Sequence, residues 1–169
     1  YSRVMDRSRG STLRTMDDFA NLSRVMVERG NLTASRRIAA DMKREWRGDK
    51  QAEMAALVSE SLCLNAEGLP EKAKTLVDKA LDLQNQVAAE TLEQGKHCSQ
   101  RMTIDLAHAC FVTGKEEDAH SLLRQVAAEN NDDPHLIEQI TSVFEKTGQA
   151  DVGKALLDQV SREIIELNN

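Results

Sequence analysis

The chain has 169 residues and a formal net charge of −6 at pH 7, with 40% hydrophobic and 30% charged residues, which is the composition of a folded protein rather than a disordered one. Only 3% of the residues are aromatic and two are prolines, and this disfavours an all-β sandwich or barrel, whose strands and turns use those residues. No run of about 18 apolar residues predicts a membrane span, and no secretory signal opens the chain. We therefore expect an all-α protein that has no membrane partner.

The cysteines indicate a reducing compartment. There are three of them, Cys63, Cys98 and Cys110, an odd number at wide spacings, whereas a disulfide framework is usually even and dense. We therefore predict reduced thiols and a cytoplasmic location. Because the chain opens on Tyr1 rather than methionine, we also expect it to be one part of a larger protein.

Charge is distributed unevenly along the chain. Residues 1–50 contain 12 Lys and Arg against 7 Asp and Glu, whereas residues 51–169 contain 10 against 21. A basic first third can bind nucleic acid or an acidic partner, but no aromatic residues interleave with the basic ones as a stacking surface for single strands needs. We favour the interpretation that the basic residues form the solvated face of one helix, which makes nucleic acid an unlikely partner: Arg36, Arg37, Lys43, Arg44 and Arg47.

Four glycines mark a repeat along the chain. Gly30, Gly68, Gly114 and Gly148 each lie between two stretches whose apolar residues recur at helical spacing. A glycine at the end of a helix can adopt the left-handed conformation that satisfies the last carbonyls. A small residue follows each glycine five positions later, where it lets paired helices approach closely: Ser35, Ala73, Ala119 and Gly153. These features predict about four helix–turn–helix pairs over residues 12–169, with residues 1–11 as a linker or the end of a preceding helix.

Two prolines and an acidic run predict where helices begin. Pro70 follows a turn glycine, and Pro134 follows a run of Asn and Asp that can cap a helix. The run Glu116-Glu117-Asp118 fits the first turn of a helix, where negative charge complements the helix dipole.

This pattern resembles the tetratricopeptide repeat family, whose units are helix–turn–helix pairs of about 34 residues. The family's small position in the first helix, seven before the glycine, falls on Ser23, Ser61, Ala107 and Thr141. The resemblance implies a right-handed α-α superhelix, a solenoid of about four pairs. The chain departs from the family in lacking its early Trp, its first-helix Tyr and its closing proline. The glycine intervals of 38, 46 and 34 residues also vary, so we expect the helix from Pro70 to about Leu92, the next helix, or both to be extended.

Motifs for catalysis, metal binding or phosphate binding are absent from the sequence. His108 and Cys110 are two residues apart and diverge by about 200° on a helix, so they cannot chelate one ion. We expect a half-buried Cys110, surface histidines, and a Trp46 that packs against the next unit rather than anchoring a partner. The chain is therefore predicted to be no enzyme, with no cofactor, no catalytic residue and no metal site.

The family resemblance implies a concave groove, lined by the first helix of each pair, that receives a peptide or helix of a partner. Its groove positions carry over onto Asn21, Arg24, Ser59, Leu62, Asn65, Arg101, Asp105, His108 and Gln139, together with Glu138 and Ser142. The leading hypothesis is a non-catalytic protein–protein interaction module within a larger, bacterial-type multidomain regulator or assembly factor. The alternatives are homodimerisation and, less favoured, nucleic-acid binding through the basic first third.

Overall fold

A computed structural model describes residues 12–94 and 99–169, and this part of the chain contains helices and no strand. The all-α prediction is therefore confirmed. Residues 1–11, His97 and Cys98, on which some of the sequence predictions fall, lie outside the described residues. In chain order the helices are α2 (Thr12–Glu28), α3 (Leu32–Glu45), α4 (Lys50–Ala66), α5 (Pro70–Gln94), α6 (Gln100–Val112), α7 (Glu116–Glu129), α8 (Pro134–Lys146) and α9 (Ala150–Asn168).

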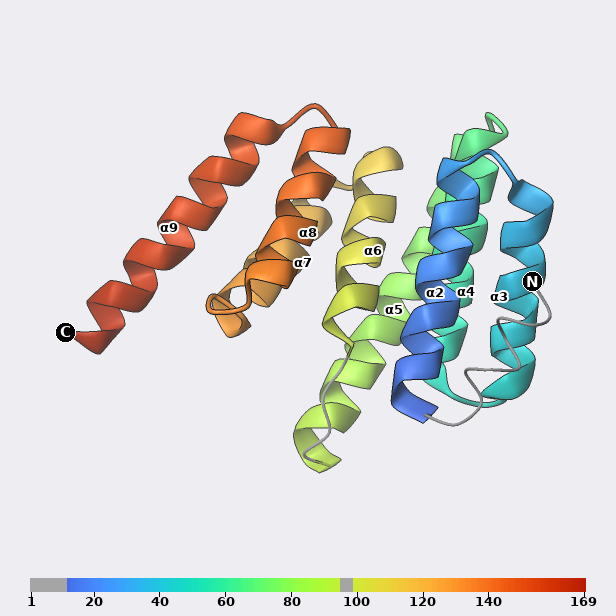
Figure 1. The fold of residues 1–169 in the computed structure, drawn as a ribbon, viewed down its shortest axis with the longest axis horizontal. Coiled ribbons are helices and arrows are strands. Elements are labelled where there is room, and N and C mark those ends of the chain that lie inside the picture. The colour runs from blue at the N-terminus through green and yellow to red at the C-terminus, as the bar shows by residue number, and fades with distance from the viewer. Residues whose placement is uncertain (1–11, 95–98) are drawn as a thin grey trace.

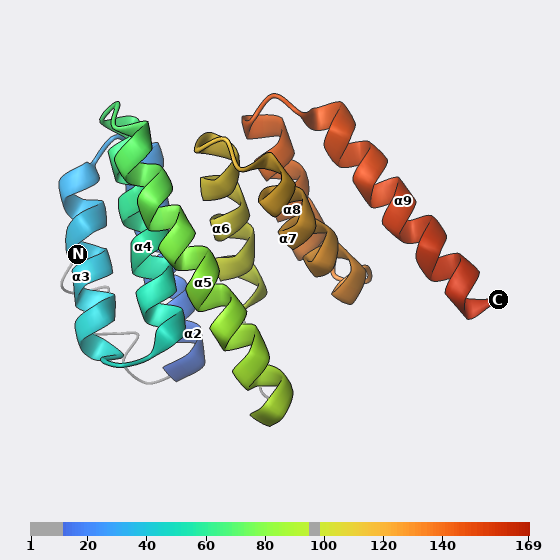
Figure 2. The ribbon, with the colours of Figure 1, turned by 180° about the vertical axis from the view of Figure 1, so that it is seen from behind.

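The helices form four antiparallel pairs arranged in a row, from α2 and α3 at one end to α8 and α9 at the other (Figure 1). The first helices of the pairs contact one another in succession, α2 with α4, α4 with α6 and α6 with α8. The second helices lie on the opposite side of the row, where α3 packs on α4, α5 on α6, and α7 on both α8 and α9 (Figure 2). The helix α2 also reaches past α4 to contact α6, so the row is curved on the side of the first helices.

The four turns within the pairs share one hydrogen-bonding pattern. At the first, the N–H of Gly30 donates to the carbonyl of Val27 (2.9 Å) and the N–H of Asn31 donates to that of Met26 (2.8 Å). This is a Schellman motif, and the same two bonds recur at the other three turns. The φ angles of the four glycines lie between +72° and +82°, which confirms the predicted left-handed conformation.

The small residues five positions after the turn glycines are all buried between paired helices. In the first pair, the Oγ of Ser35 lies 3.0 Å from the Oγ of Ser23, so the two predicted small positions meet through a hydrogen bond. In the last pair, a Cβ atom on Gly153 would lie 2.5 Å from Cγ of Phe144. The close approach predicted from the sequence is therefore present at both ends of the row.

Residue-level signals predicted where three helices start but left open which helix is extended. Pro70 and Pro134 are the first residues of α5 and α8, Glu116 begins α7, and the carboxylate of Asp133 accepts from the N–H of His135 (3.0 Å). The extension falls on α5, which has 25 residues, whereas α6 has 13. The long interval between Gly68 and Gly114 is thus explained by the second helix of its pair.

Three side chains named in the sequence analysis contribute to the core. Trp46 packs edge-on against Phe19 of its own pair, with ring centroids 5.3 Å apart. His120 is not a free surface residue, because its ring lies 5.4 Å from that of Phe111 and 5.6 Å from that of Phe144. Cys110 is fully buried, and this burial raises the pKa of its thiol to about 12. Each of these residues therefore supports the core.

Candidate binding cleft

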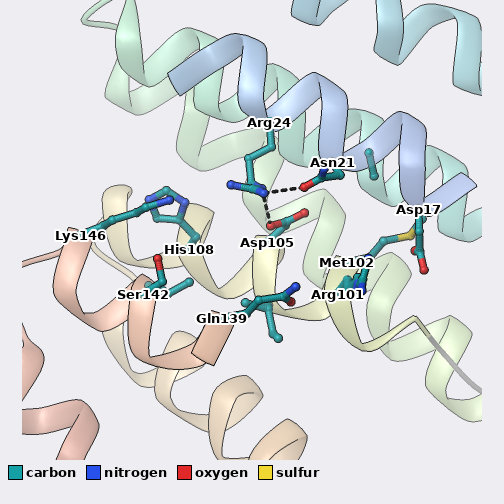
Figure 3. Close-up of a pocket in the computed structure, with 13 residues that line it drawn as sticks. Asp17, Asn21, Arg24, Arg101, Met102, Asp105, His108, Gln139, Ser142 and Lys146 are labelled. Carbon is teal, nitrogen blue, oxygen red and sulfur yellow. Dashed lines mark hydrogen bonds and ion pairs between the residues drawn. The ribbon is translucent and has the colours of Figure 1, made fainter. Parts of the chain in front are cut away.

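The first helices of three pairs, α2, α6 and α8, surround a cleft of about 110 Å³ (Figure 3). The cleft is lined by Asp17, Ala20, Asn21, Arg24, Arg101, Met102, Ile104, Asp105, His108, Gln139, Ser142, Val143 and Lys146. Seven of the eleven predicted groove residues are among them. The predicted residues in the cleft lie as far apart in the sequence as Asn21 and Gln139, so the fold brings together side chains that are distant in the chain.

Helical spacing explains why each wall presents a polar stripe. On α2, Asp17, Asn21 and Arg24 follow one another at steps of four and three residues, which places them on one face. Arg101, Asp105 and His108 on α6, and Gln139, Ser142 and Lys146 on α8, have steps of three and four as well. Met102, Ile104 and Val143 add apolar surface between the stripes.

Arg24 is the centre of the polar network on the cleft floor. Its Nη2 donates to Oδ1 of Asn21 (2.6 Å), and its Nη1 donates to Oε1 of Glu28 (2.7 Å). Its Nε lies 3.3 Å from Oδ1 of Asp105 on α6 (Figure 3). The guanidinium therefore joins the first pair to the third.

A second ion pair joins α2 to α8 at one end of the cleft. The Nζ of Lys146, at the end of α8, donates to Oε1 of Glu28, at the end of α2 (2.8 Å). The same oxygen of Glu28 accepts from Arg24, so this carboxylate connects cations on two helices. We call this contact between Glu28 and Lys146 the cross-cleft ion pair.

Three titratable groups in or beside the cleft have shifted pKa values. Burial raises the pKa of Asp105 to about 7 despite the charge of Arg24, although about 20% of its side chain is exposed. Burial also lowers the pKa of His108, and the charge of Lys146 adds to this effect. For Glu28 burial acts to raise the pKa, but the hydrogen bond and charge of Lys146, together with Arg24, outweigh it and the pKa is lowered. The charged forms of these groups are therefore partly desolvated.

The other four predicted residues, among them the exposed Glu138 on α8, do not line the cleft. Ser59 and Leu62 are buried on α4, where they line a smaller cavity of about 10 Å³ together with Arg24 and Asp105. Asn65, near the end of α4, lines neither cavity. Since α4 lies behind α2 and α6 here, the second pair supports the floor of the cleft instead of forming its wall.

Sequence reasoning missed Lys146 and Asp17, and one signal could have found them. Lys146 lies four residues after Ser142 and Asp17 lies four residues before Asn21, so each continues a stripe already identified. Asp17 also accepts a hydrogen bond from the Oγ of Ser99, the residue that caps α6 (2.7 Å).

The five basic residues predicted for a solvated helix face do not line the cleft: four lie on α3, and Arg47 follows its end. Arg37, Lys43, Arg44 and Arg47 are exposed, as predicted. Arg36 differs, because its guanidinium makes a bidentate pair with Glu60 (2.9 and 3.1 Å) and a further ion pair with Glu67. Arg44 also pairs with Asp41 on its own helix, so two of the five predicted basic groups have acidic partners.

Within the described residues, no group of three or more His, Cys, Asp or Glu side chains is arranged to hold a metal ion, and no helix is long and apolar enough to cross a membrane. Cys63 and Cys110 are buried free thiols. Comparison with known proteins yields no matching family model, curated protein or solved structure.

Proposed function

We propose that this chain is a non-catalytic protein–protein interaction module whose cleft between α2, α6 and α8 receives a peptide or a helix of a partner protein. The observation that carries the proposal is the convergence of seven predicted groove residues on one cleft from three separate helix pairs. The proposal takes the four pairs as a right-handed, tetratricopeptide-like solenoid, in which such a groove is the usual binding surface. A cytoplasmic scaffold within a multidomain regulator or assembly factor is the setting we propose for it.

The chemistry of the lining supports a polar, extended ligand. Amide groups of Asn21 and Gln139 can pair with a peptide backbone without selecting its side chains. Arg101 is exposed at the cleft, and its guanidinium can donate two parallel hydrogen bonds to a carboxylate. Met102 and Val143 add a small apolar surface next to these groups.

A peptide-binding screen followed by single substitutions tests the proposal. Arg101→Ala removes an exposed cleft cation, and Arg24→Ala removes the cation of the cleft floor. We expect both variants to lose affinity for peptides selected on the unmodified protein, by about tenfold for a hydrogen-bonded charge. Arg37→Ala, an exposed arginine on α3 outside the cleft, serves as the matched control and should bind normally. Unchanged affinity in both cleft variants would contradict the proposal.

Self-association is the second candidate, and the last helix favours it over nucleic-acid binding. On α9, which ends the row, Ile165 is 60% exposed and Leu167 is 86% exposed. Sedimentation at several protein concentrations tests this, since a homodimer predicts a sedimentation coefficient that rises with concentration. Nucleic-acid binding through α3 is weakened by the pairing of Arg36 with Glu60 and Glu67.

A further inference from the structure

The cleft is too small for the ligand that its lining suits. Its volume is about 110 Å³, whereas pockets that enclose even a small organic ligand occupy roughly 300–1,000 Å³. A peptide or helix is larger still. The described arrangement of α2, α6 and α8 therefore admits no more than one or two side chains.

Contacts between distant pairs are responsible for this narrow cleft. In an ideal solenoid each repeat touches only its neighbours. Here α2 of the first pair contacts α6 of the third, and Glu28 of α2 is bonded to Lys146 of α8 in the fourth. The bond between Glu28 and Lys146 joins residues that are 118 positions apart in the chain, and it ties α2 to α8 at one end of the cleft.

The cross-cleft ion pair is suited to reversible opening. The side chains of Glu28 and Lys146 are 37% and 44% exposed, so water and salt reach them. Exposed ion pairs are weak and are screened by salt, and their loss leaves no buried charge without a partner. Glu28 keeps its bond to Arg24 on the same helix when Lys146 leaves, so opening breaks one contact and not the whole network.

We propose that the cleft is the closed state of the groove and that the ion pair between Glu28 and Lys146 holds α2 and α8 together until a ligand separates them. The inference rests on the proposed function only in assigning the groove as the binding site. The closing contact itself is measured without any ligand. A failed peptide screen and a failed opening experiment are therefore distinguishable.

The test measures the separation of α2 and α8 by double electron–electron resonance between two spin labels. The labels are attached through Arg29→Cys, after α2, and Glu138→Cys, on α8, both exposed positions, in a background in which Cys98 is replaced by serine. Cys63 and Cys110 are buried and escape labelling. The test variant is Lys146→Met, and the matched control is Lys154→Met, which removes the same charge from an exposed position on α9.

We expect Lys146→Met to raise the population of a longer distance about two- to fivefold, the range that an exposed ion pair can shift. About 1 M salt should have a similar effect on the protein that retains Lys146, because the Debye length falls to about 3 Å. Lys154→Met should leave the distances unchanged. The proposal is overturned if Lys146→Met matches the parent protein, or if Lys154→Met opens the cleft equally. Should Lys146→Met fail to fold, the salt series on the parent decides, and a distance distribution that salt does not change overturns the proposal.

Discussion

At the position five residues after the turn glycine, the first helix pair carries Ser35 and the last pair carries Gly153. Both positions are buried where the two helices of a pair cross. Ser35 meets a hydroxyl, that of Ser23, whereas Gly153 lies under the ring of Phe144. The helices of both pairs therefore approach each other closely, but different chemical groups fill the contact in each pair. The space left for a side chain should differ between the two ends of the row.

The largest effect is expected at the last pair. Gly153→Val places a Cβ within 2.5 Å of Phe144 Cγ, and the ring belongs to the packed core of α8 and cannot withdraw easily. We expect a loss of about 3 kcal/mol in the free energy of unfolding, measured by urea denaturation, as is typical of an overpacked core. Ala155→Val, at an exposed neighbouring position on α9, is the control for β-branching in the helix. Equal losses in both variants would show that the contact with Phe144 is not tight.

Substitution of the turn glycine should have the same effect on stability in the first and the last pair. Gly30 has a φ of +76° and Gly148 a φ of +72°, and a Cβ at either would meet no atom within 4 Å. An alanine there is strained by backbone conformation alone, at a cost of roughly 1–2 kcal/mol. We expect Gly30→Ala and Gly148→Ala to lower the unfolding free energy by equal amounts. A clear difference between the two losses would show that the turns also contribute to the difference between the pairs.

A smaller loss is expected at the first pair. Ser35→Ala removes one side of the hydrogen bond with Ser23, but the Oγ of Ser23 still donates to the carbonyl of Ser35 (3.1 Å). We expect a loss of about 0.5–1 kcal/mol by the same denaturation measurement, because Ser23 keeps a partner. Ser35→Val should cost more, since Ser35 is fully buried. A loss for Ser35→Ala as large as that of Gly153→Val would contradict the contrast between the two pairs.

Local signals were enough to predict the pairs, because each acts within a few residues. Gly30 and Gly148 end helices through their own φ, and Pro70 and Pro134 begin them through their missing N–H. The groove positions on α2, α6 and α8, including Asn21, Asp105 and Gln139, came from the family resemblance, and helical spacing places those of each helix on one face. These features need no knowledge of how the pairs are arranged in space.

The remaining parts of the cleft depend on how far the row curves, which no local pattern encodes. Ser59 and Leu62 were expected in the groove, yet α2 and α6 meet in front of α4 and bury them. The bond between Glu28 and Lys146 joins helices that share no periodicity with each other. Arg36 could be recognised as basic, but its partners Glu60 and Glu67 come from the next pair. The curvature is set by the sum of interfaces between pairs, so these contacts required coordinates.

A pH-dependent effect concerns the charges that join the first pair to the third and the fourth. Because the pKa of Asp105 is raised to about 7 from an ordinary 3.8, the folded state binds its proton more tightly than the unfolded state does. The contribution of Asp105 to stability is therefore complete below about pH 4 and is lost as the pH rises towards 7. The pKa of Glu28 is lowered in the folded state. The contribution of Glu28 to stability therefore depends on pH in the opposite way and is lost on acidification.

Asp105→Asn isolates the first of these effects, because the substitution removes one titration and leaves those of Glu28 and His108 in place. We expect the variant to gain stability relative to the parent between about pH 4 and pH 7, by at most the roughly 4 kcal/mol that a pKa shift from 3.8 to about 7 implies, and by less than this because solvent reaches part of the side chain. The measurement is urea unfolding at a series of pH values, taken as the difference between variant and parent. A difference that stays flat over this range would mean that Asp105 is solvated like an ordinary surface carboxylate, and the floor of the cleft would then be more open than the contact of α2 with α6 implies.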